Sequence, residues 1–146
     1  MNRFVHITVK GIQTDDTGEE LITELSVPGE YFEKNGCRYL LYEETDVESG
    51  EISKNILKAE AHSLVLTRRG AVHTQMHFIP EQISPAEYIT PYGTLYLQIH
   101  TNDVKILFGD TAGEIRLLYT LYCEGQMLSH CQLNVSCRAL DSPAEI

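Results

Sequence analysis

The feature that most constrains this chain is an alternation of apolar and polar residues between closely spaced Gly, Pro and Asn residues. It is clearest from Arg68 to Phe78 and from Thr90 to Leu97. Period-two alternation is typical of strands, and turn residues this closely spaced leave no room for helices. The pattern predicts an all-β fold, a single antiparallel meander of about eight to ten strands. We expect the meander to close into a barrel, because closure removes exposed sheet edges.

The length of the chain, 146 residues with 42% hydrophobic residues, suits one domain with one core. We expect a single β-barrel domain over residues 1–140 and a frayed C-terminal tail over residues 141–146. Residues 79–84 are expected to form a connection bounded by Pro80 and Pro85. The expected strands cover 3–13, 21–32, 38–45, 52–59, 63–69, 72–78, 94–100, 103–108, 114–123 and 127–140.

The net charge, the N-terminal residues and the distribution of apolar residues limit the kinds of partner that we expect. A formal net charge of −10, with Arg68-Arg69 as the adjacent basic pair, disfavours nucleic acid, which requires clustered Lys and Arg. The N-terminal residues lack the apolar core of a signal peptide, and no apolar run approaches the ~18 residues of a membrane helix. We therefore expect a cytoplasmic protein with neither a nucleic-acid nor a membrane partner.

The four cysteines are too sparse for a disulfide scaffold. Cys131 and Cys137 fall in one expected strand, where they would lie about 20 Å apart at ~3.3 Å per residue, too far for a bond. We expect four free thiols.

The hairpin through Gly70 is expected to have a three-residue turn of Arg69, Gly70 and Ala71. This turn pairs Arg68 with Val72, and Leu66 with Thr74, and it places like residues on each face of the hairpin. One face would carry Leu64, Leu66, Val72, Met76 and Phe78, with Arg68 at its end, and the other Thr67, His73, Gln75 and His77.

Sequence motifs for metal binding and catalysis are weak. His73 and His77 have a spacing that suits a helix, but in a strand they would lie about 13 Å apart, too far to share one ion. Neither a Gly-x-Ser-x-Gly elbow nor a phosphate-binding glycine loop occurs. We predict no metal site and no cofactor, and we assign no catalytic residue.

Polar residues at the ends of apolar strand faces are the most informative candidates for a site. Arg68 follows Leu64 and Leu66, and Tyr42 and Glu44 follow Leu40. A partly buried guanidinium needs a carboxylate or hydroxyl partner, so these residues are expected to cluster. An ion pair that ties strands together at the rim is the preferred interpretation, and a ligand anchor is the alternative. The candidate ligand-binding residues are Tyr42, Glu44, Arg68, Tyr92, Met76 and Phe78.

Several segments together resemble a known family. They are residues 31–36, 39–44, 68–72 with Met76 and Phe78, and 90–94. In their order and spacing the chain resembles the YwiB-like family of small bacterial β-barrel proteins of unknown function. The resemblance implies a calycin-like or lipocalin-like antiparallel barrel and transfers no activity, cofactor or catalytic residue. Pro80 and Pro85 depart from the pattern expected of the family and leave the shape of one loop open.

These observations rank three candidate functions. The first is a non-enzymatic binding barrel for a small, partly apolar molecule, because a barrel of about eight strands either fills itself or holds one small ligand. The second is a protein–protein interaction module with a filled barrel and an acidic outer surface. The third is an acid/base enzyme that uses Glu44 with Tyr42 or Arg68. The expected partner is accordingly a small amphipathic molecule or another protein.

Overall fold

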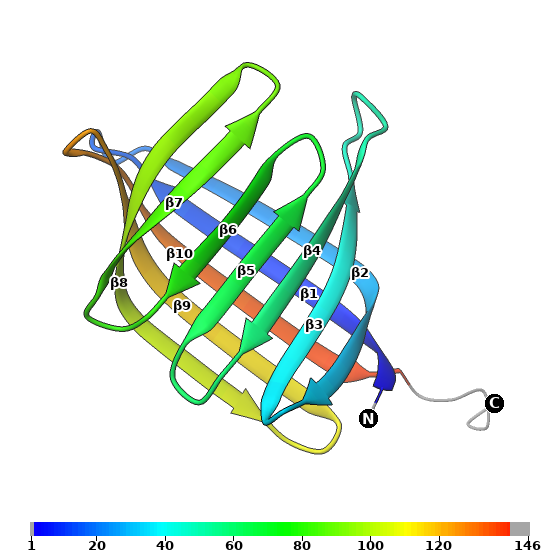
Figure 1. The fold of residues 1–146 in the computed structure, drawn as a ribbon. Coiled ribbons are helices and arrows are strands. Elements are labelled where there is room, and N and C mark those ends of the chain that lie inside the picture. The colour runs from blue at the N-terminus through cyan, green and yellow to red at the C-terminus, as the bar shows by residue number, and fades with distance from the viewer. Residues whose placement is uncertain (1, 141–146) are drawn as a thin grey trace.

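A computed structural model describes residues 2–140, which form a closed barrel of ten antiparallel strands in the order β1-β10-β9-β8-β7-β6-β5-β4-β3-β2 (Figure 1). The all-β meander predicted from the sequence is therefore confirmed. Within these residues no helix occurs that is long and apolar enough to cross a membrane. The predicted frayed tail, residues 141–146, lies outside the described residues. The strands are β1 (Asn2–Thr14), β2 (Glu20–Lys34), β3 (Cys37–Thr45), β4 (Ile52–Ala59), β5 (Leu64–Arg69), β6 (His73–Phe78), β7 (Ile83–Thr90), β8 (Gly93–Phe108), β9 (Ala112–Cys123) and β10 (Gln126–Ala139).

Two tight turns have positive φ at both of their central residues. Asn35 and Gly36 between β2 and β3 have φ values of 53° and 78°, and Glu124 and Gly125 between β9 and β10 have values of 51° and 78°. Positive φ at both central residues is the hairpin turn whose twist matches that of the flanking strands. These turns fix the register of the strands that they join.

Gly29 lies at a position where β2 pairs with both β1 and β3. It pairs with Val5 of β1 on one side and with Tyr42 of β3 on the other. A Cβ atom at this position would lie 2.5 Å from the carbonyl oxygen of Leu41 and 2.4 Å from Cδ1 of Ile7. Gly29 is thus a place where only glycine permits the close approach of three strands.

Two parts of the sequence-based strand assignment were wrong. Residues 83–90 were expected to lie outside the strands, with 83 and 84 in a connection, but they form β7, because Pro85 is tolerated where its segment pairs with β8 alone. Strand β6 is in register with β7 only at the pairs His73↔Ile89 and Thr74↔Tyr88. The expected strands 94–100 and 103–108 are one strand, β8, with an irregularity between Thr101 and Asp103 where a break was expected.

The hairpin β5–β6 has the predicted faces but a different register. The structure pairs Arg68 with Thr74, and Leu66 with Met76, rather than Arg68 with Val72 and Leu66 with Thr74. The strands are therefore connected by residues 70–72, not by Arg69–Ala71. Because the shift is two residues, every side chain keeps its face. Thr74 and Met76 are buried as a result, while Gln75 between them is exposed.

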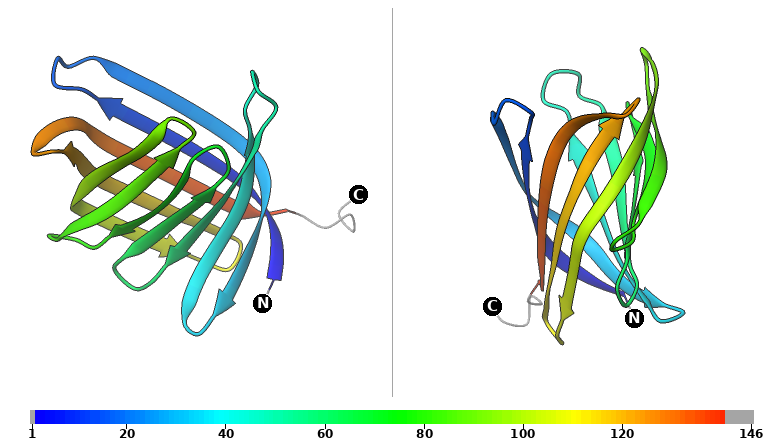
Figure 2. Two further views of the ribbon diagram at one scale, coloured as in Figure 1. Left: turned by 45° about the horizontal axis from the view of Figure 1, so that its top comes forward. Right: turned by 90° about the vertical axis from the view of Figure 1, so that its left-hand side faces the viewer.

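The core occupies one end of the barrel. The turns β1–β2, β3–β4, β7–β8 and β9–β10 lie at the opposite end from the start of β1 and the end of β10 (Figure 2). Near the end that holds the start of β1, large and fully buried apolar side chains pack together in the interior. We call this the filled half; its fully buried members include Ile7, Leu40, Leu57, Leu64, Phe78, Ile115, Leu117 and Val135.

Candidate functional site: a cavity in one half of the barrel

The other end of the barrel, which we call the hollow half, contains a cavity of about 580 Å³. Its wall is formed by residues from nine of the ten strands, β4 excepted, and most of the side chains that point inward are apolar. Binding pockets for small molecules span about 300–1,000 Å³ and are lined mainly by apolar residues with a few polar groups. The cavity has this size and character. Its inward-facing apolar residues include Val9, Leu25, Leu66, Met76, Leu97, Leu121 and Leu133.

Three exposed leucines surround the mouth of the cavity. Leu21, Leu95 and Leu128 line it at the starts of β2, β8 and β10, with exposed fractions of 59%, 49% and 45%. Exposed apolar side chains grouped around an opening are typical of sites where apolar ligands or partners bind. The apolar wall of the cavity therefore continues to the protein surface.

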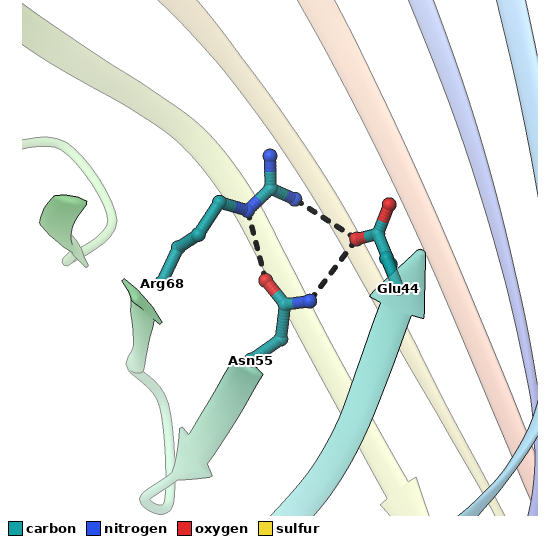
Figure 3. A network of polar contacts seen from close by, with 3 residues as sticks. All are labelled: Glu44, Asn55 and Arg68. Atoms are coloured by element: carbon teal, nitrogen blue, oxygen red, sulfur yellow. Dashed lines mark hydrogen bonds and ion pairs between the residues drawn. The ribbon is translucent and has the colours of Figure 1, made fainter. Parts of the chain in front are cut away.

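A network of Glu44, Asn55 and Arg68 supplies charge in the cavity wall (Figure 3). Arg68 donates from Nε to Oδ1 of Asn55 at 2.9 Å and from Nη2 to Oε1 of Glu44 at 3.1 Å. Asn55 donates from Nδ2 to the same Glu44 oxygen at 3.1 Å. The strand register places Asn55 directly opposite both Tyr42 and Arg68. Adjacent strands thus hold the guanidinium and the carboxylate in one fixed arrangement.

The members of this network differ in burial. Asn55 is 1% exposed, whereas the side chains of Arg68 and Glu44 are 31% and 36% exposed. A buried amide must satisfy its hydrogen-bonding groups within the protein, and Asn55 does so through these two neighbours. The charged groups themselves remain partly accessible from the cavity.

Tyrosine hydroxyls and a thiol extend the polar part of the wall. Burial, reinforced by the nearby Glu44 carboxylate and opposed by Arg68, raises the pKa of Tyr42 to about 12. Burial also raises the pKa of Tyr119 and that of the Cys131 thiol, which lies opposite Tyr119 in the register of β9 and β10. Both phenols therefore stay protonated at neutral pH, and they can donate hydrogen bonds but cannot act as bases.

The predicted site residues fall into three groups: four line the cavity, one lies in the filled half, and Tyr92 lies outside the barrel wall. Tyr42, Glu44, Arg68 and Met76 come together in the cavity wall. Phe78 lies in the filled half, fully buried, with its ring centroid 4.8 Å from that of Tyr119. These placements agree with the predicted face of the β5–β6 hairpin.

The placement of Tyr92 in the cluster was wrong. Its side chain is fully exposed at the tip of the β7–β8 turn, where its backbone N–H donates to Oγ1 of Thr90 at 3.1 Å. A turn tip projects beyond the barrel wall, so this side chain does not reach the cluster. Tyr92 is therefore absent from the cavity wall that contains Arg68.

Sequence reasoning missed Asn55 of the polar network and the cavity-lining residues Tyr88 and Tyr119. Asn55 carried a usable signal, because it shares a strand face with Leu57 and Ala59 and so stands at a core position. A polar residue at such a position requires a partner. Tyr88 and Tyr119 gave no comparable signal, since tyrosine is ordinary on either face of a strand.

The histidine pair considered as a metal site lies on the outer surface. His73 and His77 are both exposed, and Nε2 of His77 lies 3.3 Å from Oε1 of Gln75. Residues 2–140 contain no group of three His, Cys, Asp or Glu side chains arranged to hold a metal ion. The predicted absence of a metal site stays a prediction, and chemical analysis of the purified protein would test it.

Comparison with known proteins places the chain among proteins of unknown function. Residues 7–135 match the family model "Domain of unknown function (DUF1934)". The chain is 29% identical over 119 residues, 81% of each chain, to "Uncharacterized beta-barrel protein YwiB" from Bacillus subtilis (strain 168). It superimposes on the crystal structure of the ywiB protein from Bacillus subtilis with a TM-score of 0.85 at 22% identity, covering 96% of this chain and 94% of the other. The structural likeness confirms the fold.

Proposed function

The chain belongs to the DUF1934 family of unknown function, and from that premise we propose that it is a non-enzymatic barrel that binds a small, partly apolar molecule. The observation that supports this proposal is the cavity of about 580 Å³ in the hollow half, with mostly apolar walls and one partly buried polar network. A cytoplasmic location and the calycin-like character of the barrel belong to the same proposal and stay predictions.

The two other functions have less support. A protein–protein interaction module was expected to have a filled barrel, and here only one half is filled. An acid/base enzyme would need a group that gains and loses a proton near neutral pH. Tyr42, with its pKa near 12, stays protonated, and Glu44 already accepts hydrogen bonds from Asn55 and Arg68. The arrangement therefore suits recognition better than proton transfer.

Fluorescence of N-phenyl-1-naphthylamine, a neutral apolar dye, tests the proposal directly. The dye should bind in the cavity with a saturable increase in emission. Met76→Trp should reduce dye binding at least about tenfold, equivalent to about 1.4 kcal/mol, because the larger ring occupies the cavity. Gln75→Trp is the matched control, since the neighbouring side chain is exposed on the outer face.

Equal binding by both variants, with both folded by circular dichroism, would place the dye outside the barrel. The proposal would then be wrong, as it would if the wild-type protein bound no dye.

A further inference from the structure

We infer that the cavity selects a ligand whose head group is uncharged and both donates and accepts hydrogen bonds, such as an alcohol or amide, over a free carboxylate. This inference rests on the proposed function and specifies the ligand class of the same cavity. It follows from the charge balance of the cavity wall, from the unused hydrogen-bonding atoms of the polar network, and from the neighbouring phenols.

The charge balance of the wall is neutral. Three charged residues line the cavity, namely Glu24, Glu44 and Arg68. Glu24 alternates with the inward-facing Leu25 and pairs with Lys10 across β1 and β2, so its charge belongs to the outer face. Glu44 and Arg68 face inward and form an ion pair with each other at 3.1 Å. The guanidinium therefore has its counter-ion already, and the cavity offers no uncompensated positive charge to an anion.

The ion pair still has one free donor and one free acceptor. Within residues 2–140, Nη1 of Arg68 and Oε2 of Glu44 have no hydrogen-bond partner. Figure 3 shows both atoms on the side of the network that faces away from Asn55. An alcohol or amide can accept from the guanidinium and donate to the carboxylate. A carboxylate can only accept, and it would approach the negative charge of Glu44.

The phenols near the network strengthen this selection. The Arg68 charge acts on both Tyr42 and Tyr119, lowering the pKa values that burial raises, so both hydroxyls lie within its electrostatic reach. Because both phenols are protonated at neutral pH, they add neutral hydrogen-bonding groups and no charge. A head group that enters this part of the cavity loses water, and an ion loses far more solvation free energy than a neutral group.

Displacement of N-phenyl-1-naphthylamine by three ten-carbon amphiphiles tests the inference at pH 8, each compound below its solubility limit. Decanamide and 1-decanol should displace the dye from the wild-type protein at concentrations at least about tenfold lower than decanoate, because only decanoate is charged. Glu44→Gln should reverse this order, since it keeps the shape of the side chain and leaves Arg68 without a counter-ion.

Glu43→Gln is the matched control. It removes the same charge from the adjacent residue of β3, whose side chain is exposed on the outer face, and it should leave the order of the three compounds unchanged. This comparison separates a local effect of the Glu44 carboxylate from the change in net charge.

The possible failures are distinguishable. If the wild-type protein binds the dye but prefers decanoate or does not distinguish the three compounds, the inference is overturned and the binding-barrel proposal stands. The same holds if Glu44→Gln leaves the order unchanged. If neither the dye nor any of the amphiphiles binds, the proposed function itself is wrong.

Discussion

The filled and hollow halves of the barrel are built from the same strands, yet one is packed with buried apolar side chains and the other encloses about 580 Å³. Along β5 the two halves are separated by two residues: Leu64 is fully buried in the filled half, and Leu66 lines the cavity. The alternation of apolar residues is therefore sufficient to form the barrel wall. Whether the interior is filled depends on the volume of each inward-facing side chain.

Side-chain size and strand length account for the difference. In the filled half the inward positions of β1 are Val5 and Ile7, whereas in the hollow half the same strand presents Val9 and Gly11. Strands β2 and β8 have 15 and 16 residues, but β5 and β6 have only 6 each. The wall of the hollow half is thus high on one side and low on the other, which leaves the mouth open.

The largest expected effect tests this contrast with one kind of substitution on one strand. Leu64→Ala should lower the free energy of unfolding by about 3–5 kcal/mol, because it leaves a new void in close-packed surroundings. Leu66→Ala should lower it by only about 1–2 kcal/mol, since the removed atoms already face an open cavity. Urea denaturation measures both. Equal losses would show that the hollow half is packed as tightly as the filled half.

The loss of unfolding free energy at high pH should show how well the hollow half excludes water. Because burial raises the pKa of Tyr42 from 10.0 to about 12, the unfolded chain loses this proton first as the pH rises. The stability that the neutral phenol contributes is complete below pH 10 and is lost as the pH rises through 12. We expect a loss of about 2–3 kcal/mol from Tyr42 at high pH, diminished in Tyr42→Phe.

Tyr96→Phe is the control for this experiment, because Tyr96 is 68% exposed on the outer face. It should leave the alkaline loss as it is in the wild-type protein. Unfolding free energies measured in urea between pH 8 and pH 12 would reveal the effect. An alkaline loss that is identical in wild type and Tyr42→Phe would mean that water reaches the Tyr42 hydroxyl.

Substitution within the polar network should have a smaller effect on the free energy of unfolding. Arg68→Met removes an ion pair whose partners are about one-third exposed, and such pairs contribute little. It also leaves Oδ1 of Asn55 without a donor at a position that is 1% exposed, which should cost about 1–3 kcal/mol. The double variant Arg68→Met/Asn55→Leu should recover part of this loss, because it removes the orphaned group. A loss in the double variant equal to the sum of two large single losses would contradict this account.

Most of the barrel could be predicted from local patterns. Asn35-Gly36 and Gly125 identify tight turns because Gly, and to a lesser degree Asn, adopt positive φ more readily than other residues. The β5–β6 register was missed by two residues, since both registers place the same side chains inward and the pattern cannot separate them. Strand β7 was missed because Pro85 is compatible with a strand only where one edge is unpaired, and that depends on the tertiary fold.

The candidate site was less predictable than the fold. Arg68, Glu44 and Tyr42 were brought together by a single physical requirement, that a partly buried guanidinium needs partners. Asn55 and Tyr119 come from other strands, and their places in the wall depend on which strands become neighbours. The cavity itself could not be predicted, because its volume is the difference between the enclosed space and the sum of the side chains.

The smallest effect is a difference in labelling rate between two cysteines on one strand. Cys131 lines the cavity and Cys137 lies in the filled half, and burial raises the pKa of both thiols. All four cysteines have free thiols, as the sequence predicted, so none is lost to a disulfide.

The half-buried Cys37 and Cys123 should react with iodoacetamide first, since thiolate is the reactive form and access is easier. Bound N-phenyl-1-naphthylamine should then slow the labelling of Cys131 severalfold and leave Cys137 unchanged, as measured by mass spectrometry. Equal protection of both thiols would indicate that the dye tightens the whole barrel, and the two halves would then respond as one unit.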